Sequence, residues 1–235
     1  MTESSASLVA QEDLWETSEF EAGRLLRVSR GFSCLFWSMP LLSTAHAAAF
    51  VALLPSRWMF GLLLACFLPL VCGLWMLRAG GAQAPRWSAQ IGIAMLLALA
   101  AVYLCPFLIW WTLAPMQVYF AVNVAVHYLV MIGLLAVLNR LAGEFARGLG
   151  DVSLRREAQA GLIMVLWLSG CTVGALAWLF HRSGLLEAGV PTVLAQLAQL
   201  PKEARYLFLL PYAMTAYVLW RAKETGFRRA VRATP

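Results

Sequence analysis

The sequence has 235 residues, of which 61% are hydrophobic and 13% are charged, and its formal net charge is +6. Soluble proteins carry about 25% charged residues, so this composition excludes a soluble globular protein and indicates an integral membrane protein. The lysines and arginines form short clusters beside apolar segments rather than one extended basic surface. They argue against nucleic acid as a partner and for the lipid bilayer.

The cysteines predict neither a disulfide framework nor a metal site. There are five of them, each lies inside an apolar segment, and none belongs to a C-x-x-C pair. An odd number in such positions is typical of small buried hydrophobic residues, and the ligand spacing of a zinc site is absent.

Residues 1–30 are polar and acidic and precede the first apolar segment. Ser18 followed by Glu21 is typical of a capping box, which predicts a short helix that starts there and runs toward the membrane. A partly disordered tail with one surface turn fits the same residues equally well. We assign 1–30 to a cytoplasmic N-terminal segment.

The apolar segments that follow predict an all-α, polytopic membrane bundle with six transmembrane helices. The first also resembles a signal peptide, because residues 43–47 contain an A-x-A cleavage pattern, but its lead-in is long and the apolar run continues to Leu54. We therefore predict a membrane helix there. The predicted membrane domain is 31–220, with spans at 31–54, 58–77, 91–113, 115–139, 158–180 and 204–220, and a basic tail at 221–235 follows it.

Two segments between the spans have amphipathic patterns. In 140–157, charged residues recur every three or four positions opposite an apolar stripe, which predicts one amphipathic helix. This helix is either an extension of the fourth span along the interface or a docking element, with Arg147, Arg155 and Arg156 as candidate contacts to a membrane-protein or cytoplasmic partner. Residues 182–203 predict an interfacial helix or a lid.

Glycines and prolines inside the spans give two further expectations. Gly170 and Gly174 form a G-x-x-x-G motif, which predicts that a neighbouring helix approaches the fifth span closely. Prolines interrupt four of the spans, which is typical of helices that line a substrate site in transporters and also of passive helix packing. These four are Pro40, Pro69, Pro106 and Pro211.

The basic residues predict how the chain threads through the bilayer. With a cytoplasmic N-terminus, six spans place 14 of the 18 lysines and arginines on the cytoplasmic side. This bias predicts a multi-pass protein of the cell inner membrane, if the source is bacterial, with both termini in the cytoplasm. The four basic residues expected on the outer side are Arg57, Arg182, Lys202 and Arg205.

Polar residues in two spans are the candidate ligand contacts. Tyr119, Asn123 and His127 are four residues apart in the fourth span, so one helix face presents all three. In the first span, Thr44 and His46 lie in the outer half. A rise of about 1.5 Å per residue puts His127 roughly 18 Å and His46 roughly 12 Å from the outer ends of their helices, so both histidines have similar depths.

Three roles fit two histidines at matching depth. Each can form a hydrogen bond across a helix contact, both can contact a small solute, or the pair can ligate a b-type haem from its two sides. We predict no metal centre and no other cofactor. A serine hydrolase that combines Ser169 with His127 is disfavoured, because no Gly-x-Ser motif surrounds Ser169.

The absence of charge inside the spans limits the function. No Asp, Glu, Lys or Arg lies in the central portion of any predicted span, which argues against ion-coupled transport and against intramembrane acid catalysis. The leading prediction is a non-enzymatic helical subunit that scaffolds or assists a membrane complex. The alternatives are a small-solute permease component, and a membrane redox subunit that binds haem or quinone.

Overall fold

The computed structural model describes residues 22–50, 56–80, 85–114, 117–182 and 210–233. Every described element is an α-helix. The predicted capping box at Ser18 and Glu21 lies outside the described residues, and so does the predicted segment 182–203 apart from Arg182, which ends α6. The helices are α2 (Ala22–Phe50), α3 (Ser56–Gly80), α4 (Pro85–Leu113), α5 (Val118–Gly148), α6 (Val152–Arg182) and α9 (Leu210–Ala233).

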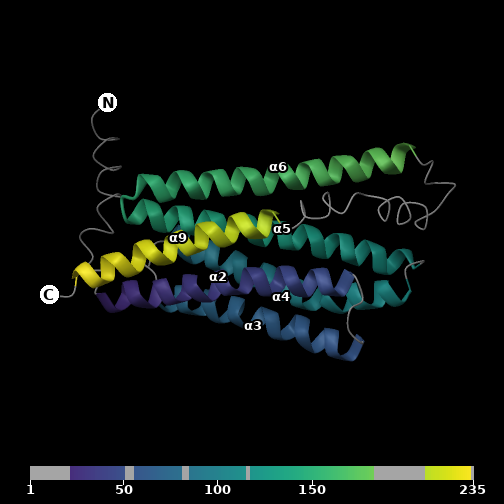
Figure 1. Cartoon of the computed structure of the whole chain (residues 1–235), viewed down its shortest axis with the longest axis horizontal. Coiled ribbons are helices and arrows are strands. Elements are labelled where there is room, and N and C mark those ends of the chain that lie inside the picture. The colour runs from purple at the N-terminus through teal and green to yellow at the C-terminus, as the bar shows by residue number, and fades with distance from the viewer. Residues whose placement is uncertain (1–21, 51–55, 81–84, 115–116, 183–209, 234–235) are drawn as a thin grey trace.

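The helices lie side by side along one long axis, and successive described helices run in opposite directions (Figure 1). The start of α2 and the end of α9 therefore lie at the same end of the bundle. This end also holds most basic residues of the described helices, and we call it the basic end. Its lysines and arginines are Arg24, Arg27, Arg30, Arg78, Arg86, Arg140, Arg147, Arg155, Arg156, Arg221, Lys223, Arg228, Arg229 and Arg232.

Within the described residues, four helices are long and apolar enough to cross a membrane. They are Trp58–Gly80, Pro85–Leu113, Val118–Gly148 and Val152–Gly174. The prediction of an all-helical bundle is thus confirmed, and four of its helices could span a membrane. The other two predicted spans, 31–54 and 204–220, fall largely in α2 and α9 and stay predictions.

Several helices extend beyond the predicted spans at the basic end. α4 begins at Pro85 rather than near residue 91, and α9 continues to Ala233 rather than ending near residue 220. Proline suits the first turn of a helix, because the amide hydrogen that it lacks would have no intrahelical partner there. Hydropathy marks only the apolar part of each helix, so it misses these polar extensions.

The prediction of one amphipathic helix over 140–157 is wrong. α5 ends at Gly148 and α6 begins at Val152, and Gly150 between them has a φ of +65°, in the left-handed region that glycine adopts readily. The Leu154 amide donates a hydrogen bond to Asp151 Oδ1 at 3.0 Å, which caps the new helix. The three- or four-residue spacing of the charged side chains continues across this turn, although these side chains belong to two antiparallel helices.

The backbones of α2 and α3 approach each other closely at Gly31 and Gly73. A Cβ placed on Gly73 would lie 2.8 Å from the Gly31 carbonyl oxygen, and one placed on Gly31 would lie 3.0 Å from that of Gly73. Any larger residue at either position would push the two backbones apart. In contrast, no described atom lies within 4 Å of a Cβ placed on Gly170 or Gly174, so the close neighbour predicted from the G-x-x-x-G motif is not found among the described helices.

The bundle has an apolar interior and an apolar surface. Phe32 of α2 and Phe145 of α5 are fully buried, with ring centroids 5.1 Å apart. Leu96, Tyr103 and Ile163 are instead exposed. Because soluble monomers rarely expose extensive apolar surface, these outward side chains fit a lipid environment.

Candidate functional site

The structure brings His46 of α2 and His127 of α5 into direct contact. Their Nε2 atoms lie 2.8 Å apart, and the two rings are partly stacked, with centroids 5.1 Å apart. Only 8% of His46 and 2% of His127 is exposed. The sequence predicted similar depths for the two histidines, and the structure places their side chains within hydrogen-bond distance of each other.

The surrounding backbone indicates the tautomers of this histidine pair. His46 Nδ1 lies 2.6 Å from the Leu42 carbonyl oxygen, which only accepts, so we assign the Nδ1 proton to His46. In neutral imidazoles, His46 Nε2 then accepts the hydrogen bond that His127 Nε2 donates. His127 Nδ1 makes no hydrogen bond within the described structure.

Two aromatic rings, one from each of two further helices, lie near His46. The ring of Phe67 from α3 lies 6.5 Å from the His46 ring, and that of Tyr212 from α9 lies 6.2 Å from it. The histidine pair therefore sits where side chains of α2, α3, α5 and α9 meet. Among these apolar neighbours, the hydrogen bond between the histidines directly joins α2 to α5.

The other candidate ligand contacts do not join the histidine pair. Tyr119 is 64% exposed and packs its ring against Phe107, with centroids 5.7 Å apart. Asn123 donates a hydrogen bond to the Tyr119 carbonyl of its own helix at 2.8 Å, and Thr44 is exposed. A cavity that all five candidates line stays a prediction.

The histidine geometry bears on metal binding as well. Metal–nitrogen bonds are about 2.0–2.1 Å long, so an ion that the two Nε2 atoms bind from opposite sides, as in a haem, would separate them well beyond the observed 2.8 Å. A haem between His46 and His127 stays a prediction that requires the two rings to move apart. In the described ranges, no group of three or more His, Cys, Asp or Glu side chains is placed to hold a metal ion.

A second buried polar contact was missed from the sequence. Asn139 of α5 donates hydrogen bonds to Thr215 Oγ1 of α9 and to the Leu135 carbonyl, both at 2.9 Å. A Cβ placed on Gly161 of α6 would collide with Asn139 Oδ1, so the glycine leaves room for the amide. Asn139 and Thr215 are 1% and 0% exposed. The only signal in the sequence was an amide at the end of an apolar span.

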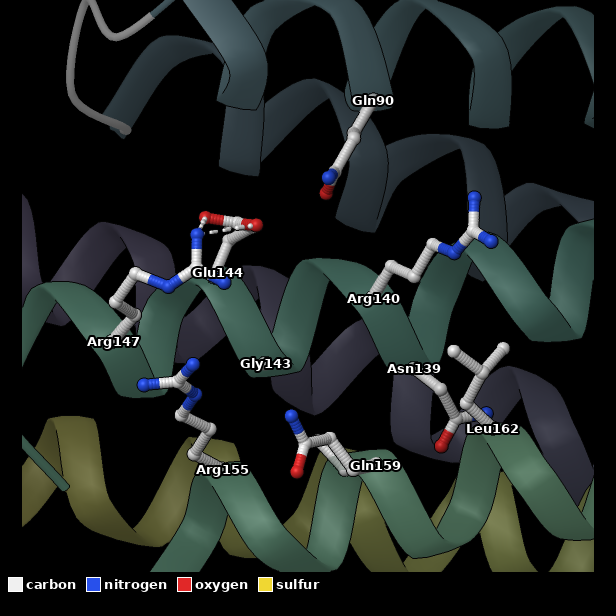
Figure 2. A pocket seen from close by; sticks show the side chains of 10 residues that line it. Gln90, Asn139, Arg140, Gly143, Glu144, Arg147, Arg155, Gln159 and Leu162 are labelled. Atoms are coloured by element: carbon white, nitrogen blue, oxygen red, sulfur yellow. Dashed lines mark hydrogen bonds and ion pairs between the residues drawn. The ribbon is translucent and has the colours of Figure 1, made fainter. Parts of the chain in front are cut away.

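The basic end contains a cavity of about 320 Å³ between α4, α5 and α6 (Figure 2). Arg147 forms an ion pair with Glu144 at 2.9 Å on its edge. Two of the three candidate partner contacts, Arg147 and Arg155, line this cavity, and Arg156 does not. The lining residues are Gln90, Asn139, Arg140, Gly143, Glu144, Arg147, Arg155, Ala158, Gln159 and Leu162.

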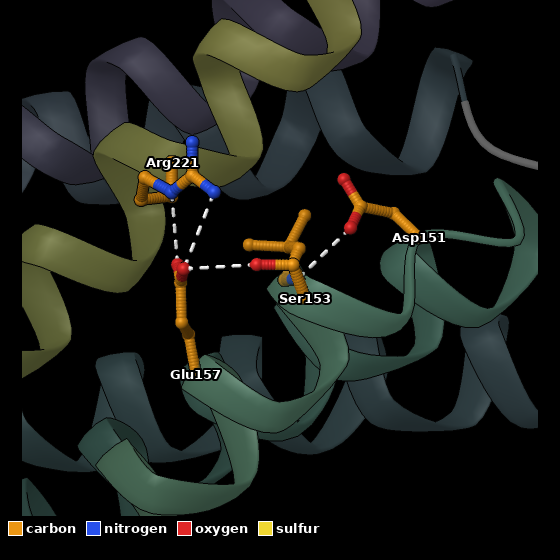
Figure 3. Close-up of polar contacts among 5 residues, drawn as sticks. Asp151, Ser153, Glu157 and Arg221 are labelled. Atoms are coloured by element: carbon orange, nitrogen blue, oxygen red, sulfur yellow. Dashed lines mark hydrogen bonds and ion pairs between the residues drawn. The ribbon is translucent and has the colours of Figure 1, made fainter.

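An ion pair near the same end joins α6 to α9 (Figure 3). Arg221 Nε lies 2.9 Å from Glu157 Oε2, and Arg221 Nη2 lies 3.2 Å from Glu157 Oε1. Ser153 adds a hydrogen bond to the same carboxylate at 3.3 Å. The hydrogen bond to Glu157 raises the pKa of the Arg221 guanidinium, which stays charged at physiological pH.

Comparisons with family models, with curated proteins and with solved structures found no match.

Proposed function

We propose that the protein is a non-enzymatic, multi-pass subunit of the cytoplasmic membrane that scaffolds or assists a larger membrane complex. The observation that carries this proposal is the direct hydrogen bond between His46 and His127. Both rings are buried within predicted spans, and they bind each other across a helix contact. A buried pair of this kind serves to hold helices in register.

The positions of the other polar candidates support a scaffold over a permease. Tyr119 and Thr44 are exposed while both histidines are buried, and Asn123 bonds to its own helix. A solute site needs polar groups that converge on a shared space. The convergent polar groups of this bundle lie at the basic end instead.

Six spans with both termini in the cytoplasm are part of this proposal. Fourteen lysines and arginines of the described helices lie at the basic end, and two, Arg57 and Arg182, belong to helix ends at the opposite side. Cytoplasmic segments of membrane proteins carry such an excess of basic residues. The basic end is therefore assigned to the cytoplasm.

Arg156 is the best placed of the three candidate partner contacts. It is exposed on the first turns of α6, and it makes no hydrogen bond or ion pair with any residue that the structure describes. Arg147 is engaged by Glu144, and Arg155 lines the cavity. The Arg156 guanidinium is therefore able to form an ion pair with an acidic surface of a cytoplasmic partner.

Affinity purification in a mild detergent, with quantitative mass spectrometry of the co-purified proteins, tests the scaffold. We expect a partner whose yield falls with Arg156→Gln and not with Arg24→Gln, which removes the same charge from the exposed start of α2. A chain that purifies alone, or a partner whose yield is equal in both variants, would overturn the proposal.

One observation favours the small-solute permease as a second candidate. His127 Nδ1 is buried and makes no hydrogen bond within the described structure, so it could accept one from a solute hydroxyl or amide. A permease would lose uptake with His127→Phe, which fills similar space without an acceptor, whereas a scaffold would keep its partner.

A further inference from the structure

The cavity at the basic end has the size and position of a ligand site. Its volume of about 320 Å³ lies in the range of about 300–1,000 Å³ that is usual for small-molecule sites. It opens where α4, α5 and α6 leave the apolar part of the bundle. Gly143 contributes to the open space, because a Cβ there would meet only the Ala158 side chain, at 3.6 Å.

The charge of the cavity favours an anion. Arg140 and Arg155 line it from α5 and α6, and neither makes an ion pair with a residue in the described part of the chain. The third arginine, Arg147, is neutralised by Glu144 at 2.9 Å. Figure 2 shows this ion pair and Arg155 on one side of the cavity and Arg140 on the other. Two guanidinium groups are thus available to bind phosphate oxygens.

Two buried oxygen atoms of the lining call for hydrogen-bond donors. Gln90 Oε1 and Asn139 Oδ1 have no hydrogen-bond partner in the described structure. The Asn139 amide cannot be turned round, because its nitrogen donates to the Leu135 carbonyl. A bare anion would leave these oxygen atoms unpaired, so the ligand needs hydroxyl groups in addition to its negative charge.

Apolar residues continue from the cavity toward the middle of the bundle. Leu162 belongs to its lining. About one turn further, Ile93 of α4 and Leu166 of α6 are exposed, and both helices are of membrane-spanning length. A ligand with hydrocarbon chains would cover these side chains while its headgroup occupies the cavity.

We propose that this cavity binds the headgroup of an anionic glycerophospholipid that carries free hydroxyl groups, as phosphatidylglycerol does. Arg140 and Arg155 bind the phosphodiester, and Gln90 and Asn139 accept hydrogen bonds from the glycerol hydroxyls. The acyl chains lie along α4 and α6. The proposal depends on the membrane location of the bundle and not on the presence of a protein partner.

Native mass spectrometry of the detergent-purified full chain tests the proposal by titration with dioleoylphosphatidylglycerol and dioleoylphosphatidylcholine. We expect tighter binding of phosphatidylglycerol. Each arginine near an anionic headgroup contributes about fivefold, so Arg140→Gln with Arg155→Gln should weaken this binding about 25-fold. The matched control is Arg24→Gln with Arg229→Gln, which removes the same charge at the same end from exposed positions of α2 and α9 and should leave binding unchanged.

Two further arms separate the lipid from other ligands. Glycerol 1-phosphate and inorganic phosphate should not compete with the lipid at similar concentrations, and Gln90→Leu should reduce the preference for phosphatidylglycerol over phosphatidic acid, which has no headgroup hydroxyl. Equal binding of both dioleoyl lipids, equal losses in the two double variants, competition by the soluble phosphates or an unchanged headgroup preference would each overturn the proposal. Arg156 is not substituted in these arms, so this test and the partner test fail independently.

Discussion

The histidine pair and the basic-end cavity are two polar regions that α5 contributes to, and they differ in where their hydrogen bonds go. At the histidine pair, three of the four ring nitrogens bond to groups of the protein itself, among aromatic side chains. At the cavity, two arginines and two amide oxygen atoms are left without such partners. Polar groups in an apolar bundle therefore either join helices or stay available for a ligand, and their bonding state tells the two apart.

Asn139 belongs to both regions, because its amide nitrogen joins α5 to α9 while its Oδ1 belongs to the cavity lining, and the approach of Gly161 to this oxygen should give the largest effect. Gly161→Ala puts a Cβ against Asn139 Oδ1, so we expect a loss of about 1–3 kcal/mol in the free energy of unfolding. Thermal or denaturant unfolding in detergent measures this loss.

Gly170→Ala is the control for this substitution, because no described atom lies near its Cβ. It should be neutral or slightly stabilising, since alanine favours a helix more than glycine does. If both variants lost the same stability, the close approach of α5 and α6 at Asn139 would be wrong.

The two histidines should show a measurable energetic coupling. In a double-mutant cycle of His46→Phe and His127→Phe, we expect an interaction of about 0.6 kcal/mol, and at most about 1.7 kcal/mol, as found for hydrogen bonds between membrane helices. Unfolding free energies of the four proteins give this value. Strictly additive losses would mean that the two rings do not bond to each other.

The ion pair between Glu157 and Arg221 should give the smallest effect. Both side chains are about a quarter exposed, so solvent screens the pair, and replacing Arg221 with Gln should cost about 0.2–1 kcal/mol of stability. This loss should shrink as the salt concentration rises. A loss that is independent of salt would show that packing, rather than charge, joins α6 to α9 here.

The sequence was most informative about single helices. Composition and the length of the apolar runs predicted an all-helical membrane bundle, and counting residues along two spans predicted that His46 and His127 have similar depths. Both inferences concern lengths along a single helix, which follow from the rise per residue. The break at Gly150 was missed because the charge pattern continues across it, although glycine and Asp151 were available as signals of a turn and a cap.

Contacts that depend on three helices could not be predicted in this way. The cavity needs Gln90, Asn139 and Arg155 from three different helices, and their meeting depends on how α4, α5 and α6 cross. Asn139 itself gave no sign of its role, since its partners Thr215 and Gly161 are ordinary residues of distant spans. The shared helix face of Tyr119, Asn123 and His127 predicted the site less well, because only His127 of these three residues is buried in the bundle.

The threading of the chain is the claim on which the membrane depths, the cytoplasmic partner surface and the lipid site all depend. Reporter proteins that are active on only one side of the membrane, fused in turn to each end of the full chain, test it most directly. We expect cytoplasmic activity for both fusions, because six alternating spans return the chain to its starting side. Fusions that report opposite sides of the membrane would contradict it.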